Sequence, residues 1–81
     1  MTSSVFTKKY QRFRELLIKH RKNTDVTQKV LAETLNKPQS YVSKYESGER
    51  RLDLIEFLDV AEALQLDKCK FIQDLEKKVS K

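Results

Sequence analysis

The chain has 81 residues, of which 38% are hydrophobic and 36% are charged, and its formal net charge is +5 at pH 7. A chain of this length is expected to form one domain, here residues 1–81, around a small core. No apolar run approaches the roughly 18 residues of a membrane helix, and the N-terminus lacks an apolar segment typical of a signal peptide. The lone cysteine, Cys69, excludes an internal disulfide. We therefore expect a cytoplasmic protein.

The composition also predicts the fold class. One glycine and one proline leave few chain breaks, and β-branched residues do not alternate over any strand-length run. We therefore predict an all-α domain. The neighbours of Cys69 include the apolar Phe71 and Ile72, so its thiol is expected to be half-buried and inert.

Charge is distributed unevenly along the chain. Residues 1–22 contain seven basic residues and one acidic residue, a net charge of +6, whereas residues 53–67 contain five acidic residues and no basic one. A polyanion is attracted to the first segment and repelled by the second. Taken alone, the same pattern is also consistent with two solvated helix faces.

The first predicted helix covers about residues 5–22. Apolar residues at a 4-3-4 spacing form one stripe along it, and these residues are Phe6, Tyr10, Phe13 and Leu17. Residues 23–26 form a connection. The second helix begins after Thr27, whose hydroxyl can cap the first turn, and ends at Asn36 in a left-handed conformation. Its expected inward face consists of Val30, Leu31 and Leu35.

Pro38 prevents the second helix from continuing, and the third helix covers about residues 39–47. It ends at Gly48, the only glycine of the chain, which is suited to a left-handed cap. Val42 and Tyr45 are expected to point inward. The opposite face is polar with few long charged side chains, which suits a surface that contacts base edges.

The fourth helix is predicted over about residues 54–65, because Asp53 and Glu56 have the spacing of a capping box. Its expected core residues are Leu54, Phe57, Leu58, Ala61 and Leu64. Asp67 can cap a fifth helix over 68–79, with Phe71, Ile72, Leu75 and Val79 on one side.

Residues 27–48 thus form two short helices joined by a tight turn. Ala32 allows close helix approach, and the second helix of the pair presents polar residues outward. This arrangement is a helix-turn-helix, whose second helix enters the DNA major groove. Glutamine can pair with adenine and lysine with guanine, and the helix starts at Gln28 and Gln39 attract phosphate. Arg50 and Arg51 follow the recognition helix and are expected to contact phosphate, or to be solvated loop charges.

The spacing of Gln28, Ala32, Asn36 and Val42 resembles the lambda-repressor and Cro-like (XRE) helix-turn-helix family over roughly residues 6–76. This resemblance implies a compact five-helix fold and DNA binding, usually as a dimer on a palindromic operator. Two positions depart from the family pattern. Asn36 replaces the usual turn glycine, and Pro38 replaces the usual capping serine or threonine.

The resemblance also implies roles for individual residues. The residues expected to face base edges are Gln39, Ser40 and Lys44. Those expected at the sugar-phosphate backbone are Gln28, Tyr41, Ser43 and Ser47, although Tyr41 is as readily an ordinary surface tyrosine. In the family, an arginine at the end of the first helix pairs with a glutamate before the terminal glycine of the third, which here are Arg21 and Glu46.

Several functional classes remain to be weighed. An enzyme is not expected, since the chain has no glycine-rich phosphate loop, no Cys/His cluster and no serine beside a histidine base. No metal, cofactor or small-molecule ligand is implied. The favoured function is a dimeric repressor that binds double-stranded DNA, with the dimer contact expected at Phe71, Ile72 and Leu75. The alternatives are a restriction-modification controller, or an antitoxin-like protein-interaction module with the same fold.

Overall fold

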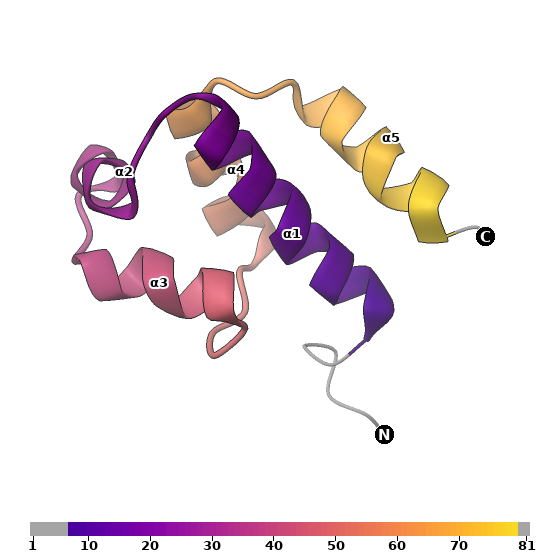
Figure 1. Cartoon of the computed structure of the whole chain (residues 1–81), viewed down its shortest axis with the longest axis horizontal. Helices are drawn as coiled ribbons and strands as arrows, with labels where there is room; N and C mark the ends of the chain where they lie inside the picture. Colours follow the sequence, from indigo (N-terminus) through magenta and orange to yellow (C-terminus); the bar gives the residue numbers. More distant parts are fainter. Residues whose placement is uncertain (1–6, 80–81) are drawn as a thin grey trace.

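The computed structural model describes residues 7–79, and within that range it contains five helices and no strand (Figure 1). The helices are α1 (Lys8–Asn23), α2 (Gln28–Leu35), α3 (Gln39–Ser47), α4 (Leu54–Leu64) and α5 (Lys68–Val79). In Figure 1, α2 and α3 lie on one side of α1 and α5 on the other. The predicted all-α, five-helix fold is confirmed. Phe6, predicted to belong to the α1 stripe, lies outside the described residues.

Short-range side-chain hydrogen bonds fix where α2, α4 and α5 begin. Thr27 accepts a hydrogen bond from the amide of Val30 at the start of α2. Asp53 and Glu56 form a complete capping box at the start of α4. Asp67 accepts from the amide of Lys70 in the first turn of α5. Each cap satisfies an amide that has no partner within its helix, so these boundaries follow from the local sequence.

Left-handed residues end three of the helices. Asn36 has φ 61°, Gly48 has φ 92° and Gln65 has φ 56°. Asparagine and glycine adopt this conformation readily, as the sequence predicts. Gln65 was expected inside the fourth helix, but it is the cap that follows it.

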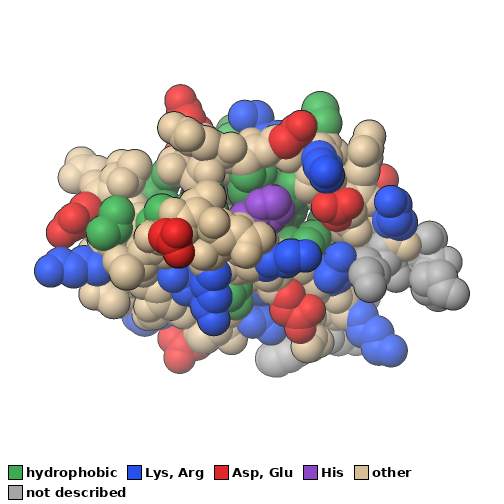
Figure 2. All heavy atoms as spheres, turned by 45° about the horizontal axis from the view of Figure 1, so that its top comes forward, with side chains coloured by type: hydrophobic (Ala, Val, Ile, Leu, Met, Phe, Trp, Pro, Cys, Tyr) green, Lys and Arg blue, Asp and Glu red, His purple; other side chains and the backbone are tan. Residues whose placement is uncertain are grey.

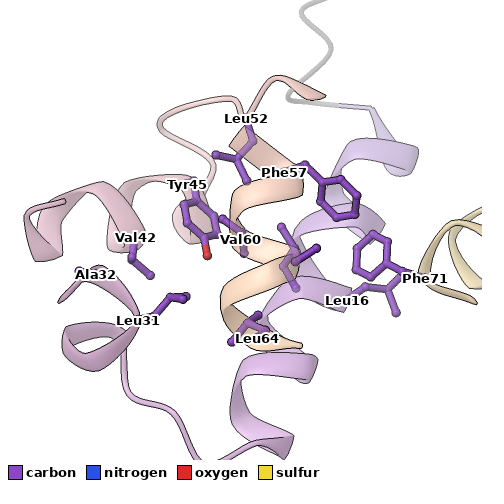
Figure 3. Close-up of a cluster of buried hydrophobic side chains, with 12 residues drawn as sticks. Leu16, Leu31, Ala32, Val42, Tyr45, Leu52, Phe57, Val60, Leu64 and Phe71 are labelled. Atoms are coloured by element: carbon purple, nitrogen blue, oxygen red, sulfur yellow. The ribbon is translucent and has the colours of Figure 1, made fainter. Parts of the chain in front are cut away.

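The core lies between α1 and the other four helices, and its side chains point toward a shared centre (Figure 3). Rings from three helices meet there: Phe71 of α5 lies 5.1 Å from Phe57 of α4 and 5.8 Å from Phe13 of α1, measured between centroids. Such aromatic pairs add to the free energy gained from burial. The rings therefore join α5 to α1 and α4.

Three residues expected in the core are exposed instead. Val30, Leu54 and Leu58 keep 47%, 67% and 37% of their surface accessible. The buried face of α4 consists of Phe57, Val60, Ala61 and Leu64. Leu54 shares their helical spacing, but it lies in the first turn of α4, where the contacting helices do not cover it. Hydrophobic spacing identifies a face, and only the packing determines how much of that face is covered.

Candidate nucleic-acid interface

The turn between α2 and α3 sets the direction of the recognition helix. Asn36 adopts its left-handed conformation there, and the amide of Lys37 donates to the carbonyl of Ala32 at 2.9 Å. Ala32 is 2% exposed and faces Val42 of α3, which is fully buried. Because alanine is small, the two helices can approach closely. Pro38 provides no side-chain cap for α3, yet the helix covers Gln39–Ser47 as predicted.

The two faces of α3 are clearly separated. Val42 and Tyr45 are buried in the core, whereas Gln39, Ser40, Lys44 and Ser47 are exposed. Ser43 and Tyr41 are half-buried. The hydroxyls of Ser43 and Ser47 donate to carbonyls within α3, at 3.3 Å and 3.1 Å, and Ser47 also accepts from the amide of Glu49 at 3.4 Å. The polar face is therefore accessible in the single chain.

A buried ion pair holds α3 against α1. Arg21 Nε donates to Glu46 Oε2 at 2.7 Å and Arg21 Nη2 to Glu46 Oε1 at 3.1 Å, with the two residues 9% and 7% exposed. Arg21 Nη1 also donates to the carbonyl of Val26 at 2.9 Å. This two-point geometry is the strongest that arginine and a carboxylate make. The structure thus contains the pair that the sequence predicts.

Gln28 belongs to the same network. Its Nε2 donates to Glu46 Oε1 at 2.8 Å, so its side chain links the start of α2 to α3. The sequence assigned Gln28 to a phosphate contact. In the structure, its side-chain amide nitrogen faces Glu46, while its backbone remains at a helix N-terminus, where phosphate binds favourably.

Arg14 is a further contact to α3 that the sequence did not indicate. Its Nη1 donates to the carbonyl of Glu46 at 2.8 Å, near the C-terminal end of α3. A Cβ on Gly48 would lie 3.2 Å from the Arg14 guanidinium. A cation at a helix C-terminus compensates carbonyls that have no partner in the helix. The available signal was the seven-residue separation from Arg21, which places both arginines on one face of α1.

Arg50 does not project freely into solvent. Its Nη2 and Nη1 donate to the two carboxylate oxygens of Glu56 at 2.7 Å and 3.1 Å, and its guanidinium lies 4.9 Å from the centre of the Tyr41 ring. The hydrogen bonds from Arg50, followed by the one from the Asp53 amide, lower the pKa of Glu56. Burial is the main reason that the pKa of Tyr41 is raised, with the charge of Glu56 adding to it. Arg50 was expected to contact a DNA phosphate, but in the structure its guanidinium is paired with the carboxylate of Glu56.

The loop after α3 is held by Tyr10, which the sequence analysis assigned only to the apolar stripe of the first helix. The hydroxyl of Tyr10 accepts a hydrogen bond from the buried amide of Leu52 at 3.0 Å. The guanidinium of Arg51 lies 5.3 Å from the centre of the Tyr10 ring, and Arg51 is exposed. Tyr10 therefore places Arg51 at the surface beside the end of α3.

The predicted dimer residues differ in exposure. Phe71 is 1% exposed and belongs to the core of the single chain, whereas Ile72 is 45% exposed and Leu75 is half-buried. Ile72 and Leu75 line an apolar groove of about 390 Å³ together with Leu54. Of the three predicted dimer residues, only Ile72 and Leu75 are therefore accessible to another molecule. Cys69 is exposed, not half-buried as expected, because it lies on the outward side of α5.

On the face shown in Figure 2, acidic and basic side chains are intermixed. The described residues contain no group of three or more His, Cys, Asp or Glu side chains that could hold a metal ion. Among the same residues, no helix is long and apolar enough to cross a membrane.

Comparison with known proteins agrees with this geometry. A family model described as helix-turn-helix matches residues 17–71. The chain is similar to the solved structure of an XRE-family like protein from Pseudomonas syringae pv. tomato str. DC3000, at 43% identity and a TM-score of 0.83, over 86% of this chain and 85% of that one. No curated protein matches the chain.

The fold is also similar to that of the wild-type restriction-modification controller protein C.Esp1396I. The TM-score is 0.82 and the identity 23%, over 93% of this chain and 99% of that one. A mutant of the same controller gives a TM-score of 0.83 at the same identity. At this level of identity, the likeness shows the fold alone.

Proposed function

Because this chain belongs to the XRE-type helix-turn-helix family of DNA-binding regulators, we propose that it is a dimeric, repressor-type protein of the cytoplasm. In this proposal, α3 lies in the major groove of a palindromic operator. The family consists of regulators and not of enzymes, in agreement with the sequence analysis. The observation that carries the proposal is the exposed polar face of α3, opposite two fully packed residues, Val42 and Tyr45.

The proposed base contacts are Gln39, Ser40 and Lys44. An amide can bond adenine N6 and N7 together, an ammonium group can reach guanine O6 and N7, and each good bidentate pair discriminates by about 1–3 kcal/mol. All three residues lie in the exposed face of α3. Gln39 is at the N-terminal end of the helix, the part of a recognition helix that contacts base edges.

The proposed backbone contacts flank these residues. Ser43, Ser47 and Tyr41 lie along the edges of the same helix, Gln28 lies at the start of α2, and Arg51 lies at the surface after α3. Contacts to phosphate fix the position of the protein but carry no sequence information directly. Their number determines how strongly salt weakens binding.

Selection of binding sites from random duplex DNA tests the proposal. The expected result is a palindrome whose half-sites have centres about 34–36 Å apart. Gln39→Ala should relax the preference at one base pair in each half-site by about 1–3 kcal/mol. The matched control is Gln73→Ala, because Gln73 is an exposed glutamine on α5. If no sequence is enriched, or if both variants behave alike, the assignment of α3 as the recognition helix is wrong.

The proposed dimer contact is the surface formed by Ile72 and Leu75 on α5. Exposed apolar side chains beside an apolar groove are suited to association. Ile72→Glu should shift the protein to a monomer in analytical ultracentrifugation. Ile55→Glu is the control, since Ile55 is an exposed apolar residue on α4, with 65% of its surface accessible. A dimer that is unchanged by Ile72→Glu would place the interface elsewhere.

A controller of restriction-modification genes is the second candidate. It is favoured by the similarity in fold to C.Esp1396I over nearly the whole length of both chains. The selected operator distinguishes the two uses, since a controller is expected to bind beside such genes. An antitoxin-like interaction module would instead bind generic duplex DNA negligibly, and with little dependence on salt.

A further inference from the structure

Arg50 lies beside the recognition helix, but its guanidinium is bound to a carboxylate of the same chain. Two hydrogen bonds, 2.7 Å and 3.1 Å long, join its terminal nitrogens to the two oxygens of Glu56. Arginine binds phosphate oxygens in the same two-point manner. Glu56 therefore occupies donors that a DNA phosphate would use, and Nη1 also donates to the carbonyl of Arg51 at 3.0 Å.

Glu56 is held in place independently of Arg50. It is the third residue of α4, and its Oε1 accepts a hydrogen bond from the amide of Asp53 at 3.0 Å as part of the capping box. The N-terminus of a helix also favours a negative charge. The ordinary pKa of a glutamate, 4.5, is already far below neutral pH, so the carboxylate is ionised with or without Arg50. It is a fixed acceptor and not a side chain that follows the arginine.

Arg50 in turn remains accessible to DNA. Its side chain is 41% exposed. Its guanidinium lies 4.9 Å from the ring centre of Tyr41, in the first turn of α3, and the Nζ of Lys37 lies 5.3 Å from the same centre. Cations over an aromatic ring are held there weakly. Without Glu56, Tyr41 would still keep Arg50 next to the helix that enters the groove.

We propose that Glu56 is an internal competitor for DNA phosphate that keeps Arg50 off the sugar-phosphate backbone. The inference rests on the proposed function of α3. The wild-type protein then binds any duplex without a phosphate contact from Arg50. Because phosphate contacts act on all sequences alike, the competitor lowers the affinity for every duplex and leaves discrimination between sequences to the base contacts. Glu56 is thus a residue that sets the overall affinity for DNA without touching it.

The test is Glu56→Gln, with Glu49→Gln as the matched control. Glutamine is also found at this position of capping boxes, so α4 keeps its start. Glu49 is an exposed glutamate between α3 and α4, and the structure gives its side chain no hydrogen bond or ion pair within the described residues. Both variants remove one negative charge, but only Glu56→Gln removes the ion pair and the two-point pairing with Arg50.

The measurement is the dissociation constant for a generic duplex over a range of salt concentrations. The plot of log K against log salt should be steeper by about 0.9 for Glu56→Gln than for Glu49→Gln. A fourfold rise in salt then costs Glu56→Gln about 3.5-fold more affinity than it costs the control. Equal slopes for the two variants would overturn the inference.

A second set of variants checks the role of Arg50, and its two single variants do not depend on the folding of Glu56→Gln. Arg50→Gln should leave the wild-type slope unchanged, whereas Arg51→Gln should reduce its magnitude by about 0.9. The double variant Arg50→Gln/Glu56→Gln has the net charge of the wild type and should have its slope. A flattening by about 0.9 in Arg50→Gln alone would mean that Arg50 already contacts phosphate, and it would overturn the inference.

The wild-type measurement separates this inference from the proposed function. Wild-type binding that is negligible and insensitive to salt would refute DNA binding itself. Wild-type binding that weakens steeply with salt, together with equal slopes for Glu56→Gln and Glu49→Gln, would refute only the competition by Glu56.

Discussion

Glu46→Ala should destabilise the domain far more than any exposed charge substitution. The change removes both hydrogen bonds to Arg21 and the one to Gln28. Arg21 is 9% exposed, so its charge would remain buried with only the carbonyl of Val26 as a partner. The contact from Arg14 to the carbonyl of residue 46 is a backbone contact and would persist. The measured loss therefore reports the side-chain network.

The expected cost is about 3–5 kcal/mol, the cost of leaving a buried charge unpaired. A domain of this size is stabilised by roughly 4–12 kcal/mol in total, so the variant loses about a quarter of that stability or more. At about 4 °C or more per kcal/mol, the midpoint of thermal unfolding should fall by at least about 12 °C. The loss follows from desolvation, since an exposed pair contributes only about 0–1 kcal/mol.

Thermal and urea unfolding followed by circular dichroism measure this loss. Glu49→Ala is the control and should change stability by no more than about 0.5 kcal/mol. The double variant Arg21→Met/Glu46→Leu should recover much of the stability, because apolar residues of similar size often replace a buried pair without loss. If Glu46→Ala unfolds within about 1 kcal/mol of the control, the network does not hold α3 in place and this reasoning is refuted.

Three further predictions concern single contacts. Gly48→Ala should cost about 1–2 kcal/mol, because alanine is strained in the left-handed conformation and its Cβ would displace Arg14; an unchanged unfolding midpoint would contradict this. Tyr45→Phe should raise stability by about 1 kcal/mol in urea unfolding, since the buried hydroxyl has no hydrogen-bond partner within the described residues; a clear loss would reveal an unseen partner. Burial raises the pKa of Tyr45 above its ordinary value of 10.0, so the wild type should lose stability as the pH rises past that value, and Tyr45→Phe should lose less. Glu56→Gln should cost no more than about 1 kcal/mol of stability at neutral pH. Because Arg50 lowers the pKa of Glu56 from its ordinary value of 4.5, this cost should shrink as the pH falls below that value and vanish below the lowered pKa. A cost independent of pH would show that the charge of Glu56 does not contribute.

Much of the recognition element could be predicted because it depends on neighbours in the chain. The caps at Thr27 and Asp53 act over three residues, and the left-handed residues Asn36 and Gly48 act on the turn that contains them. The alternation of buried and polar positions on α3 repeats every helical turn. Local chemistry therefore fixes both the helices and the face that α3 presents.

The charged residues were harder to assign, since an arginine has several possible partners at similar reach. Arg14 and Arg50 carry the same guanidinium group. In the structure, one binds the carbonyl of Glu46 and the other the carboxylate of Glu56. Neither partner is marked by a spacing within a helix. Their selection depends on where α1 and α4 lie relative to α3.

Five helices, with a polar outer face on the third, follow from the amino-acid sequence alone. The exposure of Leu54 and the hydrogen bond from the Leu52 amide to the Tyr10 hydroxyl depend on how the helices pack. The pairing of Arg50 with Glu56 depends on the same packing. The difference is one of range: capping and periodicity act within about one turn of helix, whereas coverage and ion pairing depend on distances between helices.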